Sequence, residues 1–401
     1  MAAVDPQTAA RLISERLTCL PIESLPVAHC VGAVLRENVY AERDQPPFDR
    51  VAMDGIALAA AGAAPGARRF RVQALQAAGD APLALASPGH CIEVMTGTVL
   101  PTGCDTIVPY ERIHLADGWA ELQPEEPLSA GRNIHRRASD VRQGALLLSA
   151  GAALRSPEVA IAAGAGMSRL RVSAQPRVMV ISTGNELIEP GEPIAPHQVR
   201  RSNVYGIIAA LHRHGFARVA DEHLRDDADE IRERLRAHLK TYDVLILSGG
   251  VSMGRFDLLP TVLPELGVER VLHGIAQRPG KPLWFGSSHD GCAVFALPGN
   301  PVSTLVCVAR YVVPALWAAM GAQPAPPERL ALADSVAWEP RLTGFLPVRV
   351  ALDDWGRPWA HPAPTNGSGD FASLAGTDGF VELPPGPNTY AKGFVTRLYR
   401  W

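Results

Sequence analysis

Three short segments rich in glycine and in hydroxyl or amide side chains each follow a run of apolar residues. The segments are Ser182–Glu186, Ser248–Gly254 and Pro298–Ser303, and the runs before them are strands predicted at Val178–Ile181, Val244–Leu247 and Ala293–Leu297. In an open parallel sheet, the carboxyl ends of the strands form the ligand crevice. Glycines let a ligand approach the backbone there, and free N–H groups favour anions. Together the three segments predict a phosphate or nucleotide site.

The third segment has the composition of a helix start. Asn300 suits the N-cap, Pro301 suits the first helical position, and Ser303 then falls in the first turn. A helix N-terminus offers unpaired N–H donors and the positive end of the helix dipole, which favour an anion. For this segment alone, ordinary capping explains the residues equally well. Neither a GxxxxGK[ST] loop nor a GxGxxG fingerprint occurs, so neither of those nucleotide sites is predicted.

Two basic residues flank a Pro-Gly turn. Arg278 and Lys281 are three positions apart and precede a strand predicted at Leu283–Phe285, so both can point toward one oxyanion. A solvated charged turn is the alternative interpretation. Lysine is rare in this chain, because Lys240, Lys281 and Lys392 stand among 38 lysines and arginines. Lys281 is therefore a candidate for a role that arginine cannot fill, such as a compact point charge on an oxyanion.

Five carboxylates are candidates for acid–base or metal chemistry. Glu186 and Asp257 lie in or beside the predicted strand-end loops, where a carboxylate can hold Mg²⁺ that bridges phosphates. Asp226 precedes a predicted helix and Asp54 lies in an otherwise apolar stretch, so N-capping and a turn are the simpler interpretations of these two. Asp140 is the fifth candidate.

The elements that must position these residues change character along the chain. Residues 6–17 predict an amphipathic helix, and residues 22–170 predict a β-rich region that a short helix closes. From about residue 176, strands alternate with helices at Ser202–His214 and Asp227–Leu239, which predicts a mostly parallel, doubly wound sheet covered on both faces. After a proline-rich linker, residues 328–401 predict a small C-terminal β-domain.

Composition excludes several classes of protein. The chain has 401 residues, of which 47% are hydrophobic and 20% charged, so several packed domains are expected rather than disorder. A net charge of −3 gives no global field toward nucleic acid or an anionic membrane. The six cysteines form no CxxC pair, which favours buried thiols in a reducing compartment. The N-terminus does not resemble a signal peptide, and the apolar stretch at 301–320 contains Arg310 and Pro314. We therefore expect a core helix there, and a soluble, cytoplasmic protein that binds neither nucleic acid nor membrane.

Six motifs occur in a fixed order: Pro47–Gly55, Met95–Gly97, Ser182–Leu187, Ser248–Gly254, Arg278–Pro282 and Leu297–Ser303. In this order and spacing they resemble the MoeA family of molybdopterin molybdenumtransferases, which includes the E domain of gephyrin. The match covers essentially the whole chain. Each motif is moderately specific alone, and their combination is highly specific.

The resemblance implies an elongated subunit of four parts. These are an N-terminal part from residues 1–50 and 141–175, an inserted β-rich domain at 51–140, an α/β domain at 176–323 that binds molybdopterin and nucleotide, and a C-terminal β-domain at 328–401. It also implies a homodimer whose cleft lies between the α/β domain of one subunit and the inserted domain of the other. The reaction would insert molybdate into adenylylated molybdopterin with Mg²⁺ and release AMP. The molybdopterin adenylyltransferase and the enzymes that receive the cofactor would be further partners.

Site residues follow from the same resemblance combined with the loop interpretation. The catalytic candidates are Glu186, Asp54, Asp140 and Asp257, and the metal candidates are Glu186 and Asp257. The expected substrate and nucleotide contacts are Thr96, Thr183, Gly184, Gly249, Gly250, Ser252, Gly299, Asn300 and Asp226. The expected molybdate contacts are Arg278, Lys281, Ser303, Arg349, Ser368 and Ser373.

The chain departs from the family pattern at a few of these positions. Asn185 stands where the family has Asp beside the Glu, and Arg278 stands where a first Lys is common. Pro347 stands where an Arg assigned to molybdate is common, and Arg349, two residues on, would share its strand face. Thr365–Gly369 replaces a Gly-His-Gln-x-Ser motif. These changes concern molybdate binding more than the nucleotide site.

Two other functions are consistent with some of these features. One is a non-catalytic scaffold or chaperone that keeps the pterin-binding cleft, which the changes at 185 and 347 would allow. The other is an unrelated nucleotidyl-transfer enzyme that shares only the α/β domain, although the N-terminal motifs argue against it. The leading hypothesis is an enzyme of molybdenum cofactor synthesis.

Overall fold

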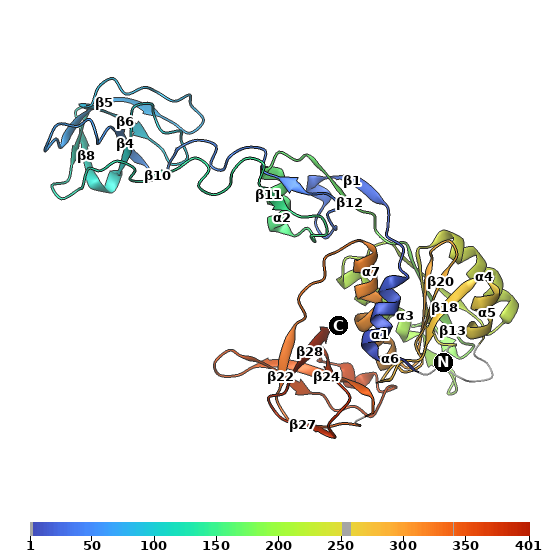
Figure 1. The fold of residues 1–401 in the computed structure, drawn as a ribbon. Helices are drawn as coiled ribbons and strands as arrows, with labels where there is room; N and C mark the ends of the chain where they lie inside the picture. The colour runs from blue at the N-terminus through green and yellow to red at the C-terminus, as the bar shows by residue number, and fades with distance from the viewer. Residues whose placement is uncertain (1–2, 251–257, 340) are drawn as a thin grey trace. The chain divides into compact units, whose positions relative to one another are not determined.

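A computed structural model describes residues 3–250, 258–339 and 341–401. Contacts divide the chain into two compact units, each described here by itself. The first unit consists of Met1–Glu37, Ala150–Arg155 and Arg169–Trp401, and the second of Asn38–Ser149 and Ser156–Ser168. In Figure 1 the colour runs from blue at the N-terminus to red at the C-terminus, so the elements can be followed in chain order.

The centre of the first unit is a sheet with the strand order β16-β13-β17-β21-β20-β18. The strands are β16 (Val219–Leu224), β13 (Val178–Thr183), β17 (Val244–Ser248), β21 (Ala293–Leu297), β20 (Trp284–Ser288) and β18 (Val268–His273). The first four pair in parallel, and β20 runs antiparallel to both of its neighbours. The predicted mostly parallel sheet is confirmed.

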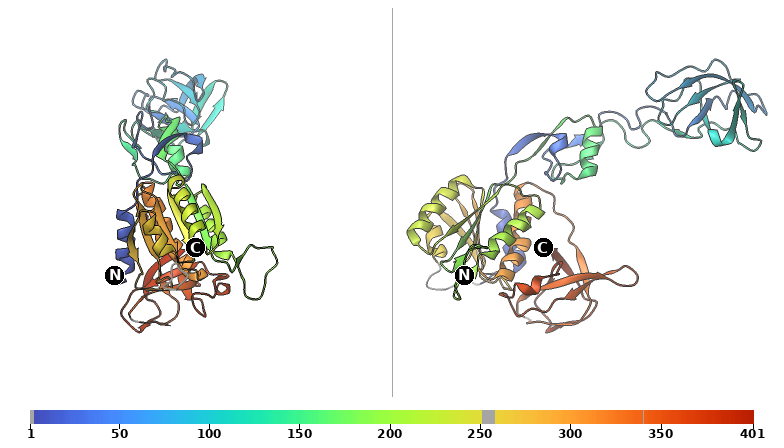
Figure 2. Two further views of the ribbon diagram at one scale, coloured as in Figure 1. Left: turned by 90° about the vertical axis from the view of Figure 1, so that its right-hand side faces the viewer. Right: turned by 180° about the vertical axis from the view of Figure 1, so that it is seen from behind.

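Helices cover both faces of this sheet (Figures 1 and 2). One face carries α1 (Pro6–Glu15), α3 (Ser202–Arg213) and α6 (Pro301–Cys307), and the other carries α4 (Ala228–Thr241) and α5 (Leu259–Glu265). Successive residues of β13 belong alternately to the two apolar clusters, because neighbouring side chains of a strand point to opposite faces. Asp227 is the N-cap of α4 and accepts from two first-turn N–H groups. Asp226, which the sequence also allowed as the N-cap, is the residue before it.

The apolar stretch after β21 is helical throughout. From α6 it continues through a π-helical turn, η3 (Val308–Val312), into α7 (Val313–Ala319). Residues Pro301–Ala319 are long and apolar enough to cross a membrane, but 72% of an 18-residue window in this stretch is buried inside the protein. This burial confirms the predicted core helix.

The C-terminal part of the first unit is a small closed barrel. Its strands are β22 (Arg329–Leu332), β24 (Thr343–Leu352), β25 (Pro358–Pro362), β26 (Gly379–Leu383) and β28 (Val395–Arg400). The ring closes because β26 pairs with both β24 and β28. A short strand from the α/β part, β19 (Gln277–Arg278), adds to β24 in parallel. This pairing ties the Arg278–Lys281 turn to the barrel.

The second unit is β-rich, as predicted. Its main sheet has the order β7-β4-β6-β5-β9-β8, with β7 (Thr106–Pro109), β4 (Gly55–Leu58), β6 (His90–Val94), β5 (Arg69–Gln76), β9 (Trp119–Leu122) and β8 (Ile113–Ala116). Smaller pairings join β3 (Arg50–Val51) to β10 (Ile134–His135) and β2 (Val39–Tyr40) to β11 (Leu146–Leu148). The unit also includes the helix α2 (Ser156–Gly164).

The fold class is confirmed, and the residue boundaries of the four-part division stay a prediction. Among the six cysteines, five are buried as expected, but Cys19 is exposed. Cys19 lies just after α1, in the connection to β1 (Ile22–Pro26), where no element covers it.

Candidate functional site

The predicted strand-end loops meet at one edge of the sheet. In the parallel ladders, Ser182 of β13 lies beside Ser248 of β17, which lies beside Leu297 of β21. Thr183 lies beside Leu224, the last residue of β16. Because the strands end in register, the loops that follow them share the carboxyl edge where α/β sheets bind ligands.

The loops after β13, β17 and β21 pack backbone to backbone. A Cβ atom at Gly249 would stand only 3.0 Å from the carbonyl oxygen of Thr183, so a larger residue there would push the two loops apart. The Gly249 N–H donates to the Leu297 carbonyl at 3.2 Å, and the α-carbon of Gly249 is near Gly299. Gly249, Gly250 and Gly299 are therefore brought together, and Gly184 directly follows Thr183, which Gly249 and Gly250 approach.

A hydroxyl group at the centre of these loops is left without a partner. The Thr183 Oγ1 atom is buried and makes no hydrogen bond to any residue that the structure describes. It faces the glycines, because Cβ atoms at Gly249 and Gly250 would lie 3.3 and 3.1 Å from it. A buried hydroxyl without a partner costs free energy, so this position favours a ligand that supplies one.

Asn185 and Asp226 connect the loops after β13 and β16. The Asn185 N–H donates to the Asp226 carboxylate at 3.2 Å, and the Asp226 N–H donates to the Asn185 side-chain oxygen at 3.3 Å. The neighbouring Glu186 side chain is exposed, and within the described ranges its carboxylate has no hydrogen bond or ion pair. Glu186 is therefore free to act on a ligand or a cation at this edge.

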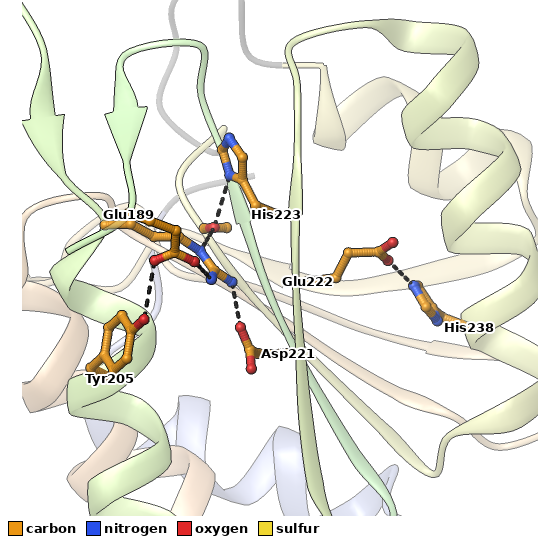
Figure 3. Close-up of polar contacts among 8 residues, drawn as sticks. Glu189, Tyr205, Asp221, Glu222, His223 and His238 are labelled. Carbon is orange, nitrogen blue, oxygen red and sulfur yellow. Dashed lines mark hydrogen bonds and ion pairs between the residues drawn. The ribbon is translucent and has the colours of Figure 1, made fainter. Parts of the chain in front are cut away.

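A buried guanidinium holds the start of the loop that carries Glu186, and Figure 3 shows two of its partners, Glu189 and Asp221. Arg201, only 5% exposed, donates from Nε to Ser182 Oγ at 2.6 Å. Its Nη1 and Nη2 atoms form ion pairs with Glu189 at 2.6 Å and with Asp221 at 2.7 Å. These three partners come from β13, from the segment after β14 (Leu187–Ile188) and from β16. One side chain thus fixes both ends of the 184–201 loop.

The outer partners of Arg201 are themselves held. Ser182 Oγ, which accepts from Arg201, lies 3.1 Å from His223 Nδ1 and can donate its proton there. Tyr205 of α3 donates to Glu189 at 3.1 Å. Burial raises the pKa of Glu189, but the hydrogen bonds from Arg201 and Tyr205 outweigh it and hold the pKa below its ordinary value. The same bond raises the pKa of Tyr205, because it favours the protonated phenol.

A cavity of about 1310 Å³ lies between the α/β part and the C-terminal barrel of the first unit. Its polar lining includes Arg278, Lys281, Asn300, Ser303 and Ser368. The pairing of β19 with β24 places Arg278 and Lys281 at its wall. Both cations are exposed and, in the described parts of the chain, neither has a hydrogen bond or an ion pair. One acidic residue, Glu339, also lines the cavity, but the two cations outnumber it, so the lining favours an anionic ligand.

The backbone of the Pro-Gly turn requires its glycine. Gly280 has a φ of 93°, and a Cβ atom there would stand 2.5 Å from Gln277 Nε2 and 2.8 Å from Cys307 Sγ. Gln277 is 1% exposed, and its side chain donates to the Pro279 carbonyl and accepts from Tyr311. The buried amide of Gln277 therefore fixes the turn that carries Lys281.

Asn300 occupies the N-cap position of α6, but its side chain makes no capping bond. Instead, its Nδ2 donates to Ser368 Oγ at 2.8 Å, and the Val302 N–H donates to the Ser368 carbonyl at 3.1 Å. The predicted N-cap position of Asn300 is confirmed, but its amide links the strand-end loop to the barrel rather than capping the helix. Ser303 is 3% exposed and lines the cavity.

Two predicted molybdate contacts lie away from this lining. Leu346 and Val348 of β24 point into the barrel core. Pro347 and Arg349 alternate with them and therefore share the opposite face, as their spacing predicted. The Arg349 side chain lies near Gly376, and neither it nor Ser373 lines the cavity. The Ser373 hydroxyl donates to the Asp370 carbonyl at 2.7 Å. Roles for Arg349 and Ser373 stay predictions.

The second unit holds the remaining candidates. The Asp54 carboxylate accepts from the Thr96 N–H at 2.5 Å and from the Thr96 hydroxyl at 2.8 Å, and these bonds lower the pKa of Asp54. Asp140 lies 2.7 Å from His135 Nε2, and Arg50 donates to His135 Nδ1 at 2.9 Å. Because Nδ1 accepts, the Nε2–H of His135 must donate to Asp140.

Two candidates, Ser252 and Asp257, lie outside the described residues. Within the described ranges, no group of three or more His, Cys, Asp or Glu is placed to hold a metal ion. Two residues were not anticipated from the sequence, Arg201 and His135. Arg201 carried no signal, since arginine is the common basic residue of this chain and its three partners are far apart in the sequence.

The fold and the cavity define a class: a multidomain α/β protein whose strand-end loops adjoin a basic cavity shared with a C-terminal barrel. Residues 4–166 match the MoeA N-terminal region (domain I and II), residues 179–318 a probable molybdopterin binding domain, and residues 329–397 the MoeA C-terminal region (domain IV). These matches follow one another along nearly the whole chain.

Whole proteins are similar over the same length. A molybdopterin molybdenumtransferase of Synechocystis is 40% identical over 92% of this chain and 93% of its own, and one of Synechococcus elongatus is 33% identical over 93% of each. The solved structure of a molybdopterin biosynthesis MoeA protein from Pyrococcus horikoshii is 25% identical, with a TM-score of 0.83 over all of both chains. The chain belongs to the MoeA family.

Proposed function

We propose that this protein is a molybdopterin molybdenumtransferase, which inserts molybdate into adenylylated molybdopterin and releases AMP. The observation that carries the proposal is the cavity beside the strand-end loops, with Arg278 and Lys281 on its wall and without a described partner for either cation. Molybdate is a doubly charged oxyanion, so two free cations in one cavity suit it. The relatives named for this activity, aligned over nine-tenths of the chain, support the same reaction.

The two parts of the site would bind different parts of the reactants. The glycines at 184, 249, 250 and 299 and the unpartnered Thr183 hydroxyl would receive the phosphates and pterin. Lys281, Arg278 and the buried Ser303 would hold molybdate next to them. Asn300 borders the cavity, lies directly after Gly299 and bonds to Ser368, so it would set the distance between the two bound groups.

Mg²⁺ would assist at the edge that carries Glu186. The side-chain oxygens of Asn185, Glu186 and Asp226 are hard donors of the kind that Mg²⁺ prefers, and the Glu186 carboxylate has no described partner. Asp257, outside the described residues, is the second proposed ligand. Bound Mg²⁺ would supply positive charge against the phosphate oxygens.

Complementation tests the proposed function. Expression of this chain in a strain that lacks its molybdenumtransferase should restore the activity of a molybdoenzyme. The Lys281→Ala variant, expressed to the same level, should not restore it. A wild-type chain that binds adenylylated molybdopterin in vitro yet restores nothing would favour the non-catalytic scaffold instead.

The proposed assembly is a homodimer, since Asp54, Thr96 and Asp140 belong to a different compact unit from the strand-end loops. Light scattering at micromolar concentration should give twice the mass of the 42.8 kDa chain. A monomer with full activity would contradict the dimer but not the reaction. A cytoplasmic location, and contact with the molybdopterin adenylyltransferase and with cofactor-receiving enzymes, complete the proposal.

A further inference from the structure

A second basic cavity lies in the first unit, apart from the site described above. It has a volume of about 460 Å³ and is lined by Gln7, Thr8, Ala10, Arg11, Arg310 and Arg397. Its lining includes none of the residues around the molybdate cavity. Three arginines and no acidic residue therefore face one small space.

Arg310 is buried with one ion pair, to Glu382, and few hydrogen bonds. It is 6% exposed, and its Nε atom makes no hydrogen bond within the described ranges. The nearest carboxylate oxygen, from Glu382, is 3.5 Å from Nε, and the Pro6 carbonyl accepts from Nη2 at 3.4 Å. A guanidinium has five N–H donors, so a single long hydrogen bond leaves most of its bonding capacity unused. Burying such a cation is costly unless an anion or acceptor completes it.

Arg310 and Arg397 lie against the same aromatic ring and line the same cavity. Arg310 is the middle residue of the π-helical turn η3, and single π-helical turns inside α-helices are frequent at functional sites. The guanidinium carbons of Arg310 and Arg397 lie 5.3 and 4.6 Å from the centroid of the same Tyr399 ring. Tyr399 is itself fixed, because its hydroxyl donates to Glu382 at 2.6 Å.

Positive charge is concentrated here beyond what the local acids balance. Arg397 stands directly opposite Arg329 in the antiparallel pair of β28 and β22, an arrangement of like charges that is destabilising by itself. Arg11 is paired with Glu15, one turn further along α1, and both are more than half exposed. Glu382 faces Arg310 but also accepts from Tyr399. An external anion would relieve both the buried guanidinium and the like-charge pair.

We propose that Arg11, Arg310 and Arg397 form a binding site for a small phosphate-like oxyanion, either free or as the phosphate group of a monoester. Guanidinium groups match phosphate oxygens with paired N–H donors, which suits this ligand better than a single carboxylate. The proposal stands independently of the molybdate cavity, since the two linings share no residue.

Calorimetric titration with inorganic phosphate at constant ionic strength tests the site. All proteins carry the Lys281→Gln substitution, so that binding in the molybdate cavity is weakened. Arg397→Gln should weaken phosphate binding about tenfold or more, the scale of one charged hydrogen bond. Arg236→Gln is the matched control, because it removes an equal charge from an exposed position of α4, which does not line the cavity, and should change the affinity less than about twofold.

Arg11→Gln should also weaken binding, and it tests the site from a different element should a barrel variant fold poorly. A parallel titration with glycerol phosphate distinguishes the two sources: tighter binding than inorganic phosphate assigns a monoester, and weaker binding assigns the free ion. Equal phosphate affinity in the parent, Arg397→Gln and Arg11→Gln proteins would overturn the proposal. So would the absence of measurable binding by the Lys281→Gln parent.

Discussion

Asn185 and Asp226 bind each other twice across the ends of β13 and β16, each donating its backbone N–H to the side-chain oxygen of the other at 3.2 and 3.3 Å. This pairing brings an exposed carboxylate next to the loop that holds Glu186. The resemblance to the MoeA family predicts Asp at position 185, where this chain has the neutral Asn185. The amide oxygen of Asn185 accepts from the Asp226 N–H, which ties the two loops together.

Asn185→Asp should keep or raise the insertion rate and lower the Mg²⁺ concentration needed for half the maximal rate. The new carboxylate can accept the same N–H of Asp226, so the loop is unchanged, while the negative charge that attracts a divalent cation increases. The measurement is insertion rate against Mg²⁺ for both proteins. Superimposable curves would assign Asn185 to the turn alone.

Glu186→Ala should reduce insertion by about 10²–10⁴, the loss expected for a positioned acid–base or ligand group. The side chain is exposed and has no described partner, so the variant should unfold at the same temperature as the wild type. Rate and melting temperature are measured on the same preparation. A variant with normal stability and normal rate would remove Glu186 from the chemistry.

Lys281→Ala should abolish detectable insertion, and Lys281→Arg should impair it by about tenfold or more. Arginine keeps the charge but presents a planar fork in place of a compact ammonium. Lys240→Arg on α4 is the control, because it makes the same exchange on an exposed helix surface. Wild-type turnover in Lys281→Arg would show that the scarcity of lysine carries no functional meaning.

The sequence allowed the α/β layers to be predicted because their signals are local. The buried runs at β13, β17 and β21, and the spacing of Ile231, Leu235 and Leu239 in α4, show their burial directly. Short antiparallel edge strands such as β18 were harder to predict from the sequence. Only scattered residues of β18 are buried, and its position depends on pairing with β20.

The candidate site was predictable only in part. The glycine-rich loops were anticipated because they follow strands whose parallel order places them together. The cavity depends on pairing between Gln277 and Thr343 and on the bond from Asn300 to Ser368, contacts across long sequence separations. Arg310 was noticed in the sequence only as a charge within an apolar helix. Its burial beside Glu382 and Tyr399, with few hydrogen bonds to the guanidinium, became visible only in the structure.

Arg201→Ala should destabilise the first unit by about 1–3 kcal/mol. This is less than the 3–5 kcal/mol for breaking a fully buried pair, because its partners Glu189 and Asp221 are 44% and 40% exposed and can be solvated. The loop that carries Glu186 loses its anchor, so insertion should fall as well. Arg201→Lys should recover little, since one ammonium cannot reach three separate acceptors.

Denaturant unfolding and insertion rates are compared with those of Arg213→Ala. That control removes an exposed arginine from the last turn of α3, and should cost less than about 0.5 kcal/mol. If Arg201→Ala unfolds at the same denaturant concentration as Arg213→Ala and keeps the wild-type rate, the guanidinium does not hold the loop.

Thr96→Val should raise the pKa of Asp54 toward its ordinary value of about 3.9. The Thr96 N–H is the larger cause of the lowered pKa and survives the substitution, while the hydroxyl bond is lost, so the rise should be partial. Because the folded pKa lies below the unfolded one, this interaction stabilises the protein above about pH 4 and is lost as the pH falls through the folded value. Thr96→Val should therefore narrow the stability difference between pH 7 and low pH.

Carboxyl NMR titration of Asp54 measures the shift, with the exposed Thr102→Val as the control. An Asp54 titration that coincides in all three proteins would show that the Thr96 hydroxyl does not stabilise the carboxylate.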